Sequence, residues 1–181
     1  DAAELAGLND IVEGAPLVIP QNGGEVIQPH PQFRVIATGN STGSGDATGL
    51  YQGVLRQNLA FLDRFRVVEV PYPDAALERQ LLKTLVPALP EAIADKLIAV
   101  ANEVRRLFLG TADAGPELTV TLSTRALLRW ARLALTFKGA PQPLAYALDQ
   151  ALTARAEPEQ REAIRRIAAD VLGELWGGPP G

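Results

Sequence analysis

The sequence predicts an α/β segment followed by an all-α segment, and three observations support this order. Residues 33–70 show a strand–helix–strand pattern, with a short apolar run at each end. The Pro-rich stretch 71–73 then interrupts the chain, and every longer apolar run after it has helical spacing. We therefore predict a domain of residues 1–73 that is α/β and a domain of residues 74–181 that is helical.

A short helix and a β-hairpin are predicted ahead of the strand–helix–strand unit. Leu5, Leu8 and Val12 have helical spacing within residues 4–13. Two runs rich in β-branched residues then flank Asn22 and Gly23, a pair typical of tight hairpin turns. A proline at position 20 suits an edge strand, so we expect the hairpin to lie at an edge or to project from the sheet.

The strand–helix–strand unit carries two candidate site residues. Residues 33–38 are almost wholly apolar, which is typical of a buried parallel strand, and Asn40 follows directly. A Gly-rich stretch leads into a helix that ends near Arg64, and a second strand is predicted over residues 66–70. Ligands of open α/β sheets bind beyond the carboxyl ends of the strands, where Asn40 is placed. A right-handed crossover returns the helix to the other rim of the sheet, so we expect Arg64 to point away from the ligand of its own subunit.

The helical part is predicted to contain five helices. Asp74 is a suitable N-cap for the first, in which Leu77, Leu81, Leu82 and Leu85 form one apolar stripe. Ser123 is a suitable N-cap for the third, over residues 124–137. The second covers residues 93–108, the fourth 144–152, and the fifth starts at Pro158 and ends before residues 177–179. We expect these helices to pack into a compact bundle.

Composition narrows the range of functions. The chain has 17 Lys and Arg against 21 Asp and Glu, a net charge of −4, which gives no general attraction to nucleic acid. It has no cysteine and one histidine, which excludes disulfides, thiolate metal sites and histidine clusters. No apolar run is long enough for a membrane span and no signal peptide opens the chain, so we expect a cytoplasmic protein. Because the chain lacks methionine and starts within a predicted helix, we expect it to be part of a longer protein.

Several sequence blocks, in this order, resemble the AAA+ ATPases, and within them the MoxR-like branch that includes the cobaltochelatase small subunit and the CbbQ/NirQ/GvpN proteins. The blocks are His30-Pro31-x-Phe33-Arg34, Ala37-Thr38-Gly39-Asn40, Gly45-Asp46-x-Thr48-Gly49-Leu50-Tyr51, Leu62-Asp63-Arg64-Phe65 and Leu122-Ser123-Thr124-Arg125-Ala126-Leu127-Leu128. Their joint occurrence over residues 5–135 is far more specific than any single block.

The resemblance implies a fold, an activity and partners. The fold would be the later part of a P-loop NTPase parallel-sheet subdomain with a β-hairpin insertion, followed by a helical lid. The parent protein would hydrolyse ATP with Mg²⁺ in a homo-oligomeric ring and would remodel or load a partner of the metal-chelatase or cofactor-insertion type. A von Willebrand A-type partner protein has precedent in the family.

Each of three site residues also has a simpler interpretation. Asn40 matches the first sensor, which orients the attacking water or contacts the γ-phosphate, but an asparagine can also cap a turn. Arg64 matches an arginine finger that acts on the neighbouring subunit, but a helix-end arginine can also bind the last carbonyls. Arg125 matches the second sensor, and a cation in the first turn of a helix is unfavourable unless an anion is near. For Arg129 and Arg132, on the same helix, we favour solvent or an acidic partner.

The nucleotide-holding motifs of an ATPase are missing from the sequence. No Gly-Lys-Ser/Thr follows a Gly-rich loop, and no acidic strand end for magnesium is recognisable in these 181 residues. We therefore expect the chain alone to be inactive and most ligands of ATP and Mg²⁺ to come from outside it. A non-hydrolysing helical protein-interaction module is the alternative, and a DNA-directed motor is disfavoured by the acidic balance.

Overall fold

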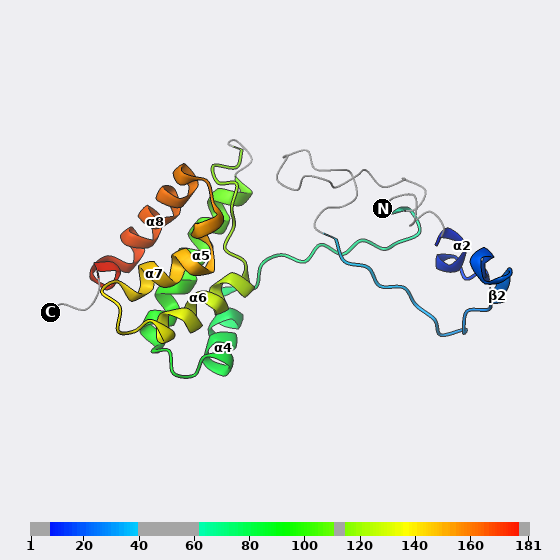
Figure 1. Cartoon of the computed structure of the whole chain (residues 1–181), viewed down its shortest axis with the longest axis horizontal. Coiled ribbons are helices and arrows are strands. Elements are labelled where there is room, and N and C mark those ends of the chain that lie inside the picture. Colours follow the sequence, from blue (N-terminus) through cyan, green and yellow to red (C-terminus); the bar gives the residue numbers. More distant parts are fainter. Residues whose placement is uncertain (1–7, 40–61, 111–114, 178–181) are drawn as a thin grey trace. The chain divides into compact units, whose positions relative to one another are not determined.

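A computed structural model describes residues 8–39, 62–110 and 115–177 of the chain (Figure 1). The chain divides into two compact units, residues 1–70 and residues 71–181, which we call the N-terminal unit and the helical unit. Each unit is described by itself.

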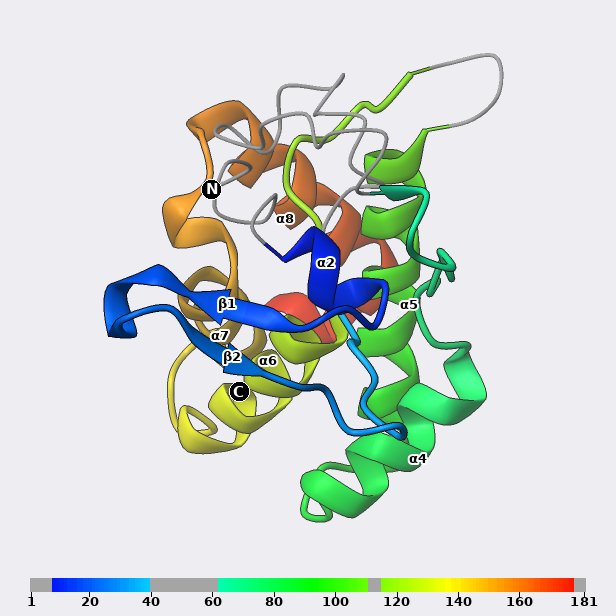
Figure 2. The ribbon, with the colours of Figure 1, turned by 90° about the vertical axis from the view of Figure 1, so that its right-hand side faces the viewer.

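The N-terminal unit contains the predicted hairpin. Strand β1 (Leu17–Ile19) pairs antiparallel with β2 (Glu25–Ile27), with Val18 opposite Val26, and Figure 2 shows the two strands side by side. The connection is the 3₁₀ turn η1 (Pro20–Asn22) followed by Gly23 and Gly24, whose φ angles of 69° and 79° favour glycine. A short helix, α2 (Asn9–Val12), precedes the hairpin within the predicted helical stretch. The hairpin prediction is confirmed.

The predicted parallel sheet is absent from the described residues, whose only sheet is the β1–β2 hairpin. Residues 33–38 and 66–70 are not in strands, and Ile36, Val68 and Val70 are 91%, 78% and 84% exposed. A parallel strand needs paired neighbours and cover on both faces, and the described residues supply neither. The connecting segment, 40–61, lies outside the described residues.

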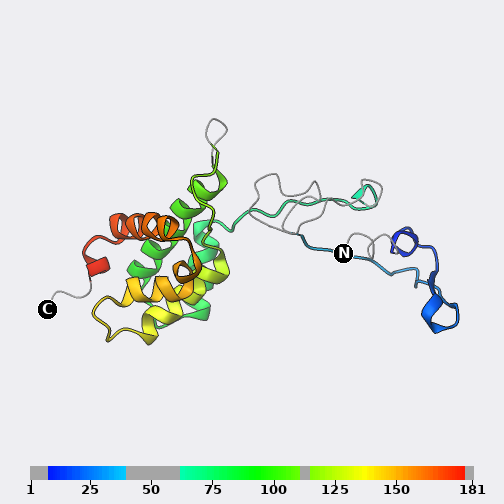
Figure 3. The same ribbon diagram turned by 45° about the horizontal axis from the view of Figure 1, so that its top comes forward.

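The described residues of the helical unit form five α-helices, as predicted. They are α4 (Ala75–Leu85), α5 (Glu91–Leu109), α6 (Thr124–Thr136), α7 (Pro143–Ala151) and α8 (Pro158–Leu172), with short 3₁₀ turns η2 (Thr153–Arg155) and η3 (Gly173–Gly177). Helix α6 packs against α7, and α5 packs against both α4 and α8 (Figures 1 and 3). The bundle encloses one apolar core, in which Leu97, Leu127 and Trp130 are fully buried.

Local signals place the starts of three of these helices. Asp74 Oδ1 accepts a hydrogen bond from the Leu77 amide at 2.7 Å, which caps α4. Ser123 caps α6 in the same way, and Pro158 occupies the first position of α8.

The apolar stripe predicted on α4 does not face the core as one surface. Leu82 is 2% exposed, but Leu77 and Leu85 are 48% and 45% exposed. The buried position one turn before Leu82 is held by a charged residue, Glu78, with no measurable exposure. A charge at that position orients α4 so that two of its leucines point outward.

Glu78 is buried because it binds an arginine of α5. Arg105, 3% exposed, donates from Nη1 and Nη2 to the two Glu78 carboxylate oxygens at 2.8 and 2.7 Å, and from Nε to the Leu122 carbonyl at 2.8 Å. The Thr124 hydroxyl, at the start of α6, donates to Glu78 at 2.7 Å. The Arg105 guanidinium also lies 4.6 Å from the centre of the Tyr72 ring. This ion pair therefore joins α4, α5, the start of α6 and the first residues of the helical unit.

We predict that Glu78→Gln lowers the free energy of unfolding by about 3–5 kcal/mol, the cost of leaving a buried charge without its partner. The substitution keeps the side-chain size but removes the charge that balances Arg105. Urea denaturation followed by circular dichroism measures the loss.

The chain contains a matched control on α5. Arg106 binds both oxygens of Glu103 at 2.9 and 2.7 Å, but these side chains are 55% and 39% exposed. Solvent screens such a pair, so Glu103→Gln should cost less than about 1 kcal/mol. Hydrogen bonds from Arg106 hold the pKa of Glu103 below its ordinary value, against a small opposing effect of burial. That small contribution is present at neutral pH and is lost as the pH falls through the lowered pKa. Equal losses for the two variants would contradict the role given to Glu78.

Candidate functional site

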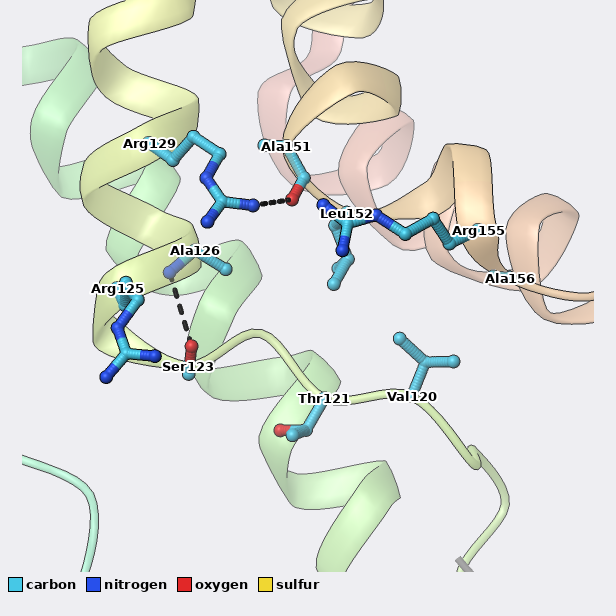
Figure 4. Close-up of a pocket in the computed structure, with 10 residues that line it drawn as sticks. All are labelled: Val120, Thr121, Ser123, Arg125, Ala126, Arg129, Ala151, Leu152, Arg155 and Ala156. Atoms are coloured by element: carbon cyan, nitrogen blue, oxygen red, sulfur yellow. Dashed lines mark hydrogen bonds between the residues drawn. The ribbon is translucent and has the colours of Figure 1, made fainter.

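A hollow of about 320 Å³ lies in the helical unit between the start of α6 and the end of α7 (Figure 4). We call it the basic pocket, because three arginines line it and no acidic residue does. Its lining residues are Val120, Thr121, Ser123, Arg125, Ala126, Arg129, Ala151, Leu152, Arg155 and Ala156. Its volume is at the lower end of the roughly 300–1,000 Å³ typical of small-molecule sites.

The N-terminus of α6 forms one wall of the basic pocket. The Ser123 hydroxyl oxygen accepts a hydrogen bond from the Ala126 amide at 3.2 Å and so fixes the first turn. Arg125 lies on this turn at the rim, beside Ser123 (Figure 4). The first turn of α6 contains no acidic residue. A cation at this end of a helix opposes the helix dipole, and a bound anion would remove the conflict.

Two further arginines line the pocket, Arg129 on the α6 wall and Arg155 on the opposite wall. Arg129, one turn after Arg125, donates to the Ala151 carbonyl at the end of α7 over 3.4 Å. Arg155 belongs to η2, and its guanidinium points back past Leu152 toward α6 (Figure 4). The three guanidinium groups can therefore approach one anion from two different elements. Such forked donors suit phosphate and carboxylate groups.

The pocket wall is connected to the first residues of the helical unit. The Tyr72 hydroxyl lies 2.9 Å from the Thr121 hydroxyl, and Thr121 lines the basic pocket. Tyr72 follows the boundary between the two units, which lies between Val70 and Pro71. The pocket wall is therefore tied to a residue within two positions of this boundary.

The three site residues predicted from the sequence are not brought together in the described structure. Arg125 lines the basic pocket. Arg64 lies in the N-terminal unit, where its Nε is 2.8 Å from a Glu13 carboxylate oxygen. Asn40 lies outside the described residues. Their roles stay predictions.

Arg155 was not singled out in the sequence. It stands in a short stretch between two helices, where a lone arginine is indistinguishable from a solvated surface residue. Only the packing of α7 against α6 places it at the pocket.

Neither a metal cluster nor a membrane span is found in the part of the chain that the structure describes. Residues 8–39, 62–110 and 115–177 contain no group of three or more acidic or histidine side chains that could ligate a metal ion. Among the helices of these ranges, none is both long and apolar enough to cross a bilayer.

Comparison with the sequences of known proteins identifies the family that this chain matches. The profile described as "CbbQ/NirQ/NorQ C-terminal" matches residues 78–171, which include all five helices in whole or in part. The aerobic cobaltochelatase subunit CobS of Sinorhizobium sp is 32% identical over 117 residues, 62% of this chain and 34% of CobS. Midasin of Dictyostelium discoideum is 32% identical over 129 residues, 70% of this chain and 2% of midasin. The uncharacterized protein YojN of Bacillus subtilis (strain 168) is 25% identical over 167 residues, 92% of this chain and 49% of YojN. The chain thus spans at most about half the length of these relatives.

We predict that Ser123→Ala lowers stability by about 1 kcal/mol, the usual cost of losing an N-cap, and also weakens anion binding at the basic pocket. The cap orients the amides of the first turn of α6, which face that pocket. Thermal unfolding measures the first effect, and titration with inorganic triphosphate measures the second.

Asp74→Ala is the matched control, because it removes the N-cap of α4, whose start does not line the pocket. It should cost a similar amount of stability and leave anion binding unchanged. Equal effects of both variants on binding would show that the start of α6 has no special part in the pocket.

Proposed function

This chain belongs to the CbbQ/NirQ/NorQ C-terminal family of MoxR-type AAA+ proteins, and we propose that it is the lid-bearing part of an ATPase that works as a homo-oligomeric ring. In this proposal the helical unit is the lid. The N-terminal unit contributes the later part of the nucleotide-binding subdomain.

The observation that carries the proposal is the position of Arg125. It stands at the start of α6, on a turn without an acidic residue, and at the rim of a pocket lined by two more arginines. This is a suitable place for a guanidinium that reaches the phosphates of ATP from the lid. Phosphoryl transfer depends mainly on such positioning and on the neutralisation of developing charge.

The exposed apolar runs of the N-terminal unit support the rest of the proposal. Val67, Val68 and Val70 are 63–84% exposed, and Ile36 is 91% exposed. Burial of apolar side chains such as these is favourable, so we infer that neighbouring strands cover them in the complete protein. Those strands would bring the phosphate-binding loop, with its lysine, and the acidic residue for Mg²⁺, since these 181 residues contain neither motif.

Asn40 and Arg64 would complete the catalytic set. Asn40 would orient the attacking water at the carboxyl end of its strand. Arg64 would reach the nucleotide of the neighbouring subunit and stabilise charge on the transferred phosphoryl group. In the described structure the Arg64 side chain is 25% exposed and paired with Glu13, which is itself 55% exposed. Because Glu13 is half-exposed, a phosphate group can replace it as the ionic partner of Arg64.

The partner of the ring is proposed from the relatives. CobS is named as a subunit of a cobaltochelatase, so we propose a remodelling or loading task of the metal-chelatase or cofactor-insertion type. A von Willebrand A-type protein is the proposed partner. ATPase activity of the complete protein, with this chain in place, tests the proposal, and its absence would favour a non-hydrolysing interaction module.

We predict that, in the complete protein, Asn40→Ala leaves ATP affinity within a few-fold but lowers turnover by ~10²-fold, the scale of one lost transition-state contact. Steady-state kinetics and nucleotide binding measured on the same preparation separate the two effects. Unchanged turnover would assign Asn40 to the turn alone.

We predict that Arg64→Ala abolishes most ATPase activity and leaves nucleotide binding in place. Rings are mixed from two kinds of subunit: one carries Arg64→Ala with an intact phosphate-binding loop, and the other carries an intact Arg64 with a disabled loop. Activity should return where an intact arginine faces an intact loop across a subunit boundary. Arg66→Ala, two residues further along, is the control and should have little effect. If mixed rings stay inactive, the arginine acts within its own subunit.

A further inference from the structure

We propose that Arg155 forms the second side of a polyphosphate site in the basic pocket, opposite Arg125 and Arg129 of α6. The ligand would be the polyphosphate chain of a nucleoside triphosphate. The identity of this ligand rests on the proposed function, but the anion site itself rests on the pocket.

The positive charges at the basic pocket are not balanced by the residues that line it. Three guanidinium groups and the N-terminus of a 13-residue helix meet at one hollow, and none of its ten lining residues is acidic. Arg125 and Arg129 are one turn apart on the same helix, a spacing at which like charges repel. Such an arrangement is costly without an anion and favourable with one that carries several negative charges.

Several arginines of the helical unit are satisfied within the protein. Arg79 and Arg165 pair with carboxylates, and Arg161 donates to two carbonyls. Within the described residues, by contrast, Arg155 and Arg125 make no hydrogen bond or ion pair. Arg129 makes one long bond, of 3.4 Å, to a carbonyl. Arg132 and Arg166 also make none within the described residues, but they lie apart from the pocket, whereas Arg125 and Arg155 line one hollow.

The segment that bears Arg155 is held in place by hydrogen bonds. Thr153 is fully buried, and its hydroxyl donates to Asp149 at 2.6 Å. Arg161 of α8 donates to the carbonyls of Thr153 and Ala154 at 3.1 and 3.2 Å. The backbone next to Arg155 is thus fixed by two helices, although the Arg155 side chain is exposed. A fixed backbone lowers the entropy lost when its side chain binds a ligand.

The facing wall is equally well supported. Trp130, next to Arg129, is fully buried, and its indole N–H donates to the Leu144 carbonyl at the start of α7 at 2.9 Å. This bond joins α6 to α7. The distance between the two arginine-bearing walls is therefore set by the core of the bundle, and the pocket is preformed.

Binding of inorganic triphosphate to the 181-residue chain tests the anion site without the phosphate-binding loop. Two-dimensional NMR should show the amides of residues 123–126 and 153–156 shifting together. Arg155→Gln and Arg129→Gln should each weaken binding about 5- to 10-fold, as expected for one lost hydrogen bond at a solvent-exposed site. Arg155→Lys, which keeps the charge, should recover part of the affinity.

Two exposed arginines outside the pocket serve as matched controls. Arg132→Gln removes a charge from the same helix as Arg129, and Arg166→Gln removes one from α8. Both should leave triphosphate binding within two-fold, and all variants should keep the parent's unfolding midpoint within a few degrees. Equal weakening by the control and pocket variants would show that only net charge matters and would overturn the proposal.

Kinetics of the complete protein separate this inference from the proposed function. If the protein hydrolyses ATP, Arg155→Gln should raise KM about 5- to 10-fold, while Arg132→Gln leaves it unchanged. An active protein in which Arg155→Gln has no effect on KM overturns the inference alone. A complete protein that binds triphosphate through Arg155 but never hydrolyses ATP overturns the proposed function and leaves the anion site standing.

Discussion

The buried ion pair between Glu78 and Arg105 is the interaction on which the helical unit depends. Neither side chain is more than 3% exposed, so each charge relies on the other for the stabilisation that water would give. The carboxylate also accepts a hydrogen bond from Thr124, and the guanidinium donates to the Leu122 carbonyl. Two helices and the segment leading into α6 must therefore take one relative position. A purely apolar contact, which has no preferred direction, would fix this relative position less strongly.

This constraint reaches the basic pocket within a few residues. Thr124 and Leu122, which bind the ion pair, flank Ser123, the cap of α6. Arg125 follows directly. The backbone that carries it is therefore held by the buried ion pair, through Leu122 and Thr124, and by the Ser123 cap. On the other side, the Tyr72 ring lies against the Arg105 guanidinium. The start of the helical unit and the pocket thus share one network of contacts.

The two units differ in how completely each buries its own apolar side chains. The helical unit buries a continuous core of Leu, Val, Ala and Trp side chains within its own helices. The N-terminal unit leaves Ile36, Val68 and Val70 largely exposed, and its described sheet has two short strands. The helical unit thus supplies its own core, whereas within the described residues the apolar runs of the N-terminal unit have no strands to pair with.

The sequence by itself determined the features that depend on near neighbours. Asp74 and Ser123 set helix starts through bonds to amides three residues on, the runs around Asn22 and Gly23 formed a hairpin, and Arg125 was placed on the first turn of its helix. Only the tertiary structure decided which side chains meet across the bundle. Arg155 lines the same pocket as Arg129 because α7 packs on α6, and Glu78 is buried because it pairs with Arg105, 27 positions further along the chain. The parallel sheet is absent from the described residues for the same reason. Capping and hairpin pairing are local, whereas ion pairs, pockets and parallel strands need partners that the chain brings close only by folding.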